Sequence, residues 1–71
     1  MGVTGTHRGR VTEFDAGRGW GVVTADDGTE YGFHCVAIAD GTRRVPVGAV
    51  VRFGIRAGHR GRWEAVDLVA D

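Results

Sequence analysis

Two runs of β-forming residues, joined by a tight turn, constrain the fold of this chain more than any other feature. The runs are residues 20–25 (Trp-Gly-Val-Val-Thr-Ala) and residues 30–35 (Glu-Tyr-Gly-Phe-His-Cys), and residues 26–29 between them read Asp-Asp-Gly-Thr. An Asp-Gly pair between two such runs is the strongest short-range signal for a β-hairpin. The sequence therefore predicts a hairpin whose strands are residues 20–25 and 30–35.

Three further strands are expected around this hairpin. They are residues 10–14, 49–56 and 62–69, with turns at 15–17 and 58–61, a short helical turn at 36–38 and a loop from 39 to 48. No window has the spacing of an amphipathic helix, and 13 glycines disfavour one. Five short strands predict an all-β fold, and a small five-stranded antiparallel β-barrel is favoured because closure removes exposed sheet edges.

The length of 71 residues leaves room for one domain. That domain is expected over residues 8–69, after a flexible N-terminus of residues 1–7. Side chains alternate between the two faces of a strand, which divides the hairpin into inward and outward positions. The inward positions are Gly19, Gly21, Val23, Tyr31 and Phe33, and the outward positions are Trp20, Val22, Gly32 and His34. Six further residues complete the expected core: Val11, Val51, Phe53, Ile55, Val66 and Leu68.

Composition narrows the function classes. Nine arginines balance nine acidic residues, and the formal net charge of zero weighs against strong non-specific binding to nucleic acid. Every basic residue other than histidine is arginine, which suits stacking on planar rings and forked phosphate contacts. No apolar run is long enough to cross a bilayer, so no membrane partner is expected. The single cysteine excludes an internal disulfide, and a cytoplasmic location is expected.

The sequence offers no constellation for catalysis. His34 and Cys35 are adjacent in an expected strand, so their side chains leave opposite faces and form no nucleophile–base pair. Serine is absent, and the paired aspartates of residues 26–27 are explained by turn chemistry. One cysteine and three histidines give no zinc spacing. We therefore expect a protein that is not an enzyme and has no catalytic residue, metal site or cofactor.

Taken in order, these segments resemble the bacterial cold-shock domain family from Gly9 to Leu68. The resemblance rests on Gly-Arg-Val at 9–11 with Phe-Asp at 14–15, on Gly-Trp-Gly-Val-Val at 19–23, and on Phe-His at 33–34. Members of that family are OB-fold barrels that bind single-stranded RNA and DNA through motifs on adjacent strands. The resemblance implies a nucleic-acid-binding site on one outer face. We expect its residues to be Phe14, Arg18, Trp20 and His34, with Arg60 at the final hairpin as an added cation.

Several aromatic rings usual in that family are replaced here. The replacing residues are Thr12 and Glu13 on the first strand, Val22 on the second, and Gly32 and Cys35 around the histidine motif; the loop ring gives way to residues 42–44 (Thr-Arg-Arg). Losing about four stacking partners at ~1–3 kcal/mol per base predicts weaker binding than is usual for the family. Residues that could compensate are Arg43, Arg44, Arg62 and Trp63.

Each site residue also has a purely structural interpretation. Trp20 could cover a barrel seam, Phe14 could plug the barrel edge, and the histidine and arginines could be solvated surface groups. Two hypotheses therefore stay open at this point. In the first, the chain is a single-stranded RNA- or DNA-binding module, serving as an RNA chaperone or in transcription. In the second, the barrel has lost most nucleic-acid binding and contacts a protein partner or a second copy of itself.

Overall fold

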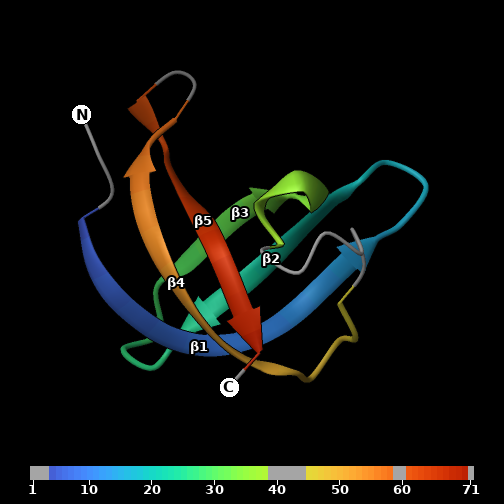
Figure 1. The fold of residues 1–71 in the computed structure, drawn as a ribbon, viewed down its shortest axis with the longest axis horizontal. Coiled ribbons are helices and arrows are strands. Elements are labelled where there is room, and N and C mark those ends of the chain that lie inside the picture. Colours follow the sequence, from blue (N-terminus) through green and yellow to red (C-terminus); the bar gives the residue numbers. More distant parts are fainter. Residues whose placement is uncertain (1–3, 39–44, 59–60, 71) are drawn as a thin grey trace.

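Five strands form a closed barrel in the computed structural model, which describes residues 4–38, 45–58 and 61–70 (Figure 1). The elements are β1 (Thr4–Asp15), β2 (Trp20–Ala25), β3 (Glu30–His34), the 3-10 helix η1 (Cys35–Ala37), β4 (Val50–Ala57) and β5 (Trp63–Ala70). Around the barrel the strands follow the order β1-β2-β3-β5-β4. The predicted all-β, five-stranded barrel is confirmed. Within the described part of the chain, no helix is long and apolar enough to cross a bilayer.

The barrel is antiparallel, as expected, except at one seam. The pairs β1–β2, β1–β4, β2–β3 and β4–β5 are antiparallel, but β3 and β5 run parallel where they meet. Only Gly32 and Glu64 pair there, and a parallel bridge between Ile38 and Leu68 extends the contact. The reason is geometric. Directions alternate through four antiparallel pairings, so the first and last strands of an odd-numbered ring point the same way.

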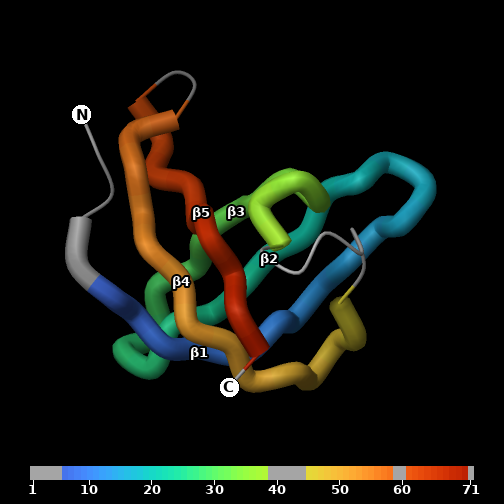
Figure 2. The backbone as a smooth tube through the Cα atoms, in the orientation of Figure 1, coloured from blue at the N-terminus to red at the C-terminus, as the bar shows by residue number. Residues whose placement is uncertain are grey.

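Strand β1 is longer than the sequence indicates and bends to pair on both sides. Its first half pairs with β4, from Thr4 opposite Ile55 to Arg10 opposite Val50, and residues 9–15 pair with β2. Figure 2 shows the resulting curved path. Residues 4–7, expected to be flexible, are therefore part of the sheet, and the expected domain boundary at residue 8 falls inside β1. Residues 1–3 lie outside the described residues.

The core is close to the expected one. On β1, β4 and β5 five residues are buried as expected: Val11, Val51, Phe53, Val66 and Leu68. In the hairpin, Val23 and Phe33 are also buried as expected. Ile55 and Tyr31 are only half-buried, and Tyr31 packs edge-on against Phe53 with ring centroids 5.8 Å apart. Gly19 belongs to the turn before β2 and not to the inward face. Three buried hydrophobic side chains were not expected: Ala25, Ile38 and Ala65.

The turn between β2 and β3 makes a pH-dependent contribution to stability. The backbone N–H of Thr29 donates to Oδ1 of Asp27 at 2.9 Å, and this bond, followed by one from the Thr29 hydroxyl, lowers the pKa of Asp27. A carboxyl whose pKa is lower in the folded state stabilises the fold above its unfolded pKa, and the contribution disappears as the pH falls through the folded pKa.

We therefore expect Asp27→Ala to lower the unfolding midpoint in urea at pH 7. The difference from the wild type should shrink below about pH 4, where an unperturbed aspartate becomes protonated. Asp26→Ala, which removes a carboxylate from the same turn, is the matched control and should lower the midpoint at pH 7 less than Asp27→Ala does. A difference between wild type and Asp27→Ala that is constant from pH 7 to pH 3 would contradict this assignment.

Candidate functional site

Trp20 and His34 lie directly opposite each other on the outer face of β2 and β3. They are cross-strand partners in the antiparallel register, and their ring centroids lie 4.6 Å apart with the planes at 75°. Such an edge-to-face contact fixes the orientation of both rings. The Trp20 side chain nevertheless remains 36% exposed. The outward placement of these two residues, predicted from strand alternation, is confirmed.

The indole of Trp20 lies over the backbone of Gly32, its diagonal neighbour on β3. A Cβ atom placed on Gly32 would clash with Cζ2 of Trp20 and lie 2.8 Å from Cη2, closer than real Cβ atoms approach. From the sequence, Gly32 counts only as a lost ring. In the structure the space that a side chain there would fill is taken by the larger indole. The indole thus packs against β3 at Gly32, while Trp20 as a whole is 36% exposed.

Phe14 has both a packing role and a place at the site. Its ring stacks on buried Phe33, with centroids 6.0 Å apart and an interplanar angle of 10°. The same half-buried side chain borders a shallow cavity of about 220 Å³, which we call the first cavity. The first cavity is lined by Glu13, Phe14, Asp15, Arg18, Trp20 and Gly21. The structure therefore brings together three of the predicted site residues, and Phe14 also packs against the core.

Charge in the first cavity is mixed. The backbone N–H of Arg18 donates to Oδ1 of Asp15 at 3.1 Å, and Nε of Arg18 lies 3.9 Å from Oδ2 of the same carboxylate. The Arg18 side chain is 84% exposed, so this ion pair is weak and the guanidinium can turn toward a ligand. Glu13 adds a second carboxylate to the cavity wall. Two acids beside one arginine disfavour the close approach of several phosphates.

Three of the remaining expected residues lie outside the described residues, namely Arg43, Arg44 and Arg60. Trp63 begins β5 opposite Ala57 and is 50% exposed; among the described residues no ring contact joins it to Trp20. The sequence predicted that Cys35 ends the second strand of the hairpin, but in the structure Cys35 begins η1. Its backbone N–H donates to the carbonyl of Gly19 at 2.8 Å. Among the described residues, no three metal-ligating side chains gather at one place.

A closed five-stranded barrel with Trp20 and His34 side by side on the outer face of β2 and β3 defines the class as an OB-fold of the cold-shock type. Among solved structures the fold is similar to Drosophila Unr CSD456, with a TM-score of 0.78 and 16% identity, over 94% of this chain and 27% of that one. At that identity the similarity concerns the fold alone.

Two curated proteins are similar in sequence. A cold shock-like protein of Thermotoga maritima is 38% identical over 55 residues, which cover 76% of this chain and 83% of that protein. Cold shock protein 1 of Arabidopsis thaliana is 39% identical over 64 residues, 87% of this chain, which spans about a fifth (21%) of the Arabidopsis protein. No family profile matches the chain. The similarity along most of the Thermotoga protein establishes that the chain belongs to the cold-shock protein family.

Proposed function

We propose that this protein binds single-stranded nucleic acid, RNA or DNA, by stacking bases on the outer face of β2 and β3. The observation that carries this proposal is the Trp20 indole, which packs over Gly32, makes an edge-to-face contact with His34 and belongs to a residue that is 36% exposed on the outer face. Aromatic faces bind bases of any sequence because every base has a π-face. Membership of the cold-shock protein family supports the same function. In the cell we place this activity in the cytoplasm, in RNA chaperoning or transcription.

The composition of the site predicts modest affinity. The open indole and the half-buried Phe14 offer one or two stacking positions, each worth about 1–3 kcal/mol per base. Arg18 is the cation that lines the first cavity, and its guanidinium also forms an ion pair with Asp15. We therefore propose weaker binding than a face with a full set of rings would give, with one or two phosphates neutralised.

Fluorescence anisotropy of a labelled single-stranded oligonucleotide tests the proposal. At low salt we expect saturable binding, and binding to a duplex of the same sequence should be weaker. The logarithm of the affinity should fall with the logarithm of salt concentration with a slope of about −0.7 per phosphate contacted. The absence of any signal change up to about 100 μM protein, the weak end of non-specific binding, would contradict the proposed function.

Glu13 is expected to oppose binding. Its carboxylate lines the first cavity and is exposed, so Glu13→Gln removes a negative charge without disturbing the core. We expect affinity to rise about two- to fivefold at low salt, because one charge near a phosphate is worth up to ~1 kcal/mol in water. The gain should fade as salt is added.

Glu30→Gln is the matched control for this change. Glu30 is an exposed acid at the start of β3, opposite Thr24 and outside the first cavity. Both variants alter net charge equally, so a general charge effect would raise affinity to the same extent in each. Equal gains in the two variants would rule out a local role for Glu13.

The second candidate function is contact with a protein partner or with a second copy of the chain. It is favoured by Val36, Val47 and Val69, which are each more than half exposed. Sedimentation velocity separates the two functions. A monomer that binds the oligonucleotide supports the first, whereas a dimer that does not bind it supports the second.

A further inference from the structure

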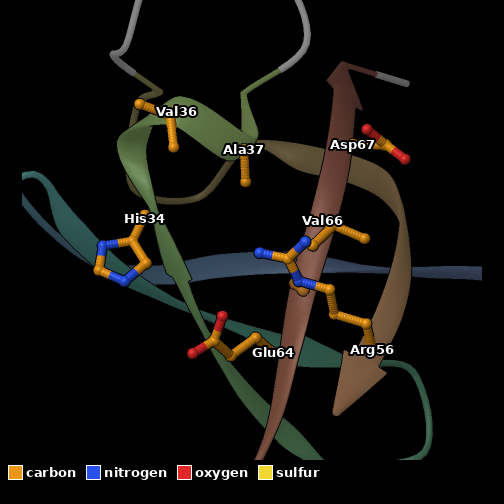
Figure 3. Close-up of a pocket in the computed structure, with 8 residues that line it drawn as sticks. His34, Val36, Ala37, Arg56, Glu64, Val66 and Asp67 are labelled. Carbon is orange, nitrogen blue, oxygen red and sulfur yellow. The ribbon is translucent and has the colours of Figure 1, made fainter. Parts of the chain in front are cut away.

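A second cavity lies beside the stacking face, across the seam between β3 and β5. Its volume is about 250 Å³, and its walls include His34, Val36, Ala37, Arg56, Glu64 and Val66 (Figure 3). Pockets that hold drug-sized ligands usually measure about 300–1,000 Å³, so this second cavity suits one planar ring system. None of the functions expected from the sequence uses Arg56 or Glu64.

The second cavity continues the stacking face without a break. Gly32 on β3 pairs with Glu64 on β5, and Glu64 pairs with Arg56 on β4. Because the indole of Trp20 covers Gly32, Glu64 is the next side chain along this row. His34 contacts Trp20 and also lines the second cavity. A strand with one base on Trp20 can therefore place a neighbouring base in the second cavity.

Arg56 and Glu64 bring opposite charges to the second cavity. Figure 3 shows the guanidinium of Arg56 reaching from β4 across β5 toward His34, with the carboxylate of Glu64 below these two groups in the view. Glu64 is half-buried and packs against Gly58; a Cβ atom on Gly58 would lie 2.6 Å from Oε2. Among the described residues, no hydrogen bond or ion pair joins Arg56 to Glu64. The cavity thus presents two carboxylate acceptors next to guanidinium donors.

We infer that the second cavity is a base subsite that selects guanine, an inference that rests on the proposed function. The N1–H and N2 amino groups of guanine lie side by side and can donate to both oxygens of the Glu64 carboxylate, while O6 accepts from Arg56. Adenine and cytosine each offer one amino donor on that edge, and thymine or uracil offers a single N–H between two carbonyls. Guanine is the base that gives a carboxylate two adjacent donors and an arginine an acceptor.

A phosphate group fits the same cavity poorly. Glu64 lines it together with Arg56, and its carboxylate would repel a phosphate drawn to Arg56. A neutral base with donors and an acceptor on one edge meets no such penalty. The apolar walls at Val36, Ala37 and Val66 suit the faces of a flat ring.

Three labelled oligonucleotides of equal length test the assignment: oligo-dT, oligo-dT with one central guanine, and the same strand with inosine, which lacks the N2 amino group. For the wild type we expect the guanine strand to bind at least about fivefold tighter than the other two. Glu64→Gln should reduce this ratio of affinities, guanine strand over oligo-dT, below about twofold. Glu30→Gln, the charge control, should keep the preference.

Two further results keep the assignment falsifiable. Gly58→Ala should displace the Glu64 carboxylate and also reduce the preference for guanine, with the fold of each variant verified by circular dichroism. Equal affinity of the wild type for the guanine and inosine strands would overturn the guanine subsite while leaving the proposed function in place. If none of the three strands binds, both the subsite and the proposed function fail.

Discussion

Replacing Trp20 with alanine is expected to weaken the binding of a single-stranded oligonucleotide about 5- to 150-fold. The indole is the main open ring of the site, and loss of base stacking costs about 1–3 kcal/mol per base. The fold should survive, because Trp20 packs on the outer face over Gly32 and His34 and is not part of the buried core. Anisotropy with oligo-dT measures the loss, and thermal unfolding verifies the fold.

Two variants show whether that loss comes from stacking. Gly32→Ala keeps the indole but places a methyl group where the ring now lies, so it should also weaken binding by displacing the ring. Trp63→Ala removes an equally large ring that is 50% exposed at the start of β5, and binding should change less than about twofold. A loss in Trp63→Ala as large as that in Trp20→Ala would place the stacking site elsewhere.

Gly21→Ala is expected to cost at least about 2 kcal/mol of unfolding free energy. A Cβ atom on Gly21 would lie 2.6 Å from Cζ of Phe33, 2.8 Å from the carbonyl oxygen of Glu13 and 2.9 Å from Cδ1 of Phe14. The carbonyl belongs to the β1 backbone, which pairs with β2 at this point and cannot withdraw without breaking the ladder. Overpacking of this kind typically costs about 1–3 kcal/mol.

That cost is a large fraction of the stability of such a small domain. At about 0.05–0.15 kcal/mol per residue, a chain of 71 residues has roughly 4–10 kcal/mol of unfolding free energy. Gly17→Ala is the matched control, since a Cβ atom there meets only Oδ1 of Asp15, at 3.4 Å. Urea unfolding should show a lower midpoint for Gly21→Ala than for Gly17→Ala. Equal midpoints would show that the barrel tolerates a side chain at this crossing.

The hairpin was predictable because its signals are local. Strand β2 matches the expected residues 20–25 at both ends, and β3 differs only in ending one residue earlier. The elements η1, β4 and β5 are each displaced by one residue at both ends. The early part of β1 carries no comparable pattern, because residues 4–9 are small, polar and glycine-rich. They become a strand by pairing with β4, a tertiary contact some forty residues away in the sequence. The parallel seam likewise follows from closure of the ring and not from any short segment.

The part of the site that lies on the hairpin was predictable, because it depends on the same local signals. Strand alternation places Trp20 and His34 on one face, and the turn fixes the hairpin register that puts Gly32 diagonal to Trp20. Counting residues from the turn could therefore have predicted that the indole of Trp20 packs over Gly32. The pairing of Glu64 with Gly32 and Arg56 could not be found in this way. It depends on ring closure and on a register shift between β4 and β5, where Asp67 adopts a φ of 55°.

A titration with unlabelled oligo-dT, followed by ¹H–¹⁵N correlation spectra, tests the central claim most directly. The account predicts the largest shifts at the indole N–H of Trp20 and at the backbone amides of Phe14, Gly32 and His34, with the indole N–H of Trp63 nearly unchanged. A saturable response that moves Trp63 and leaves the Trp20 indole in place would contradict it.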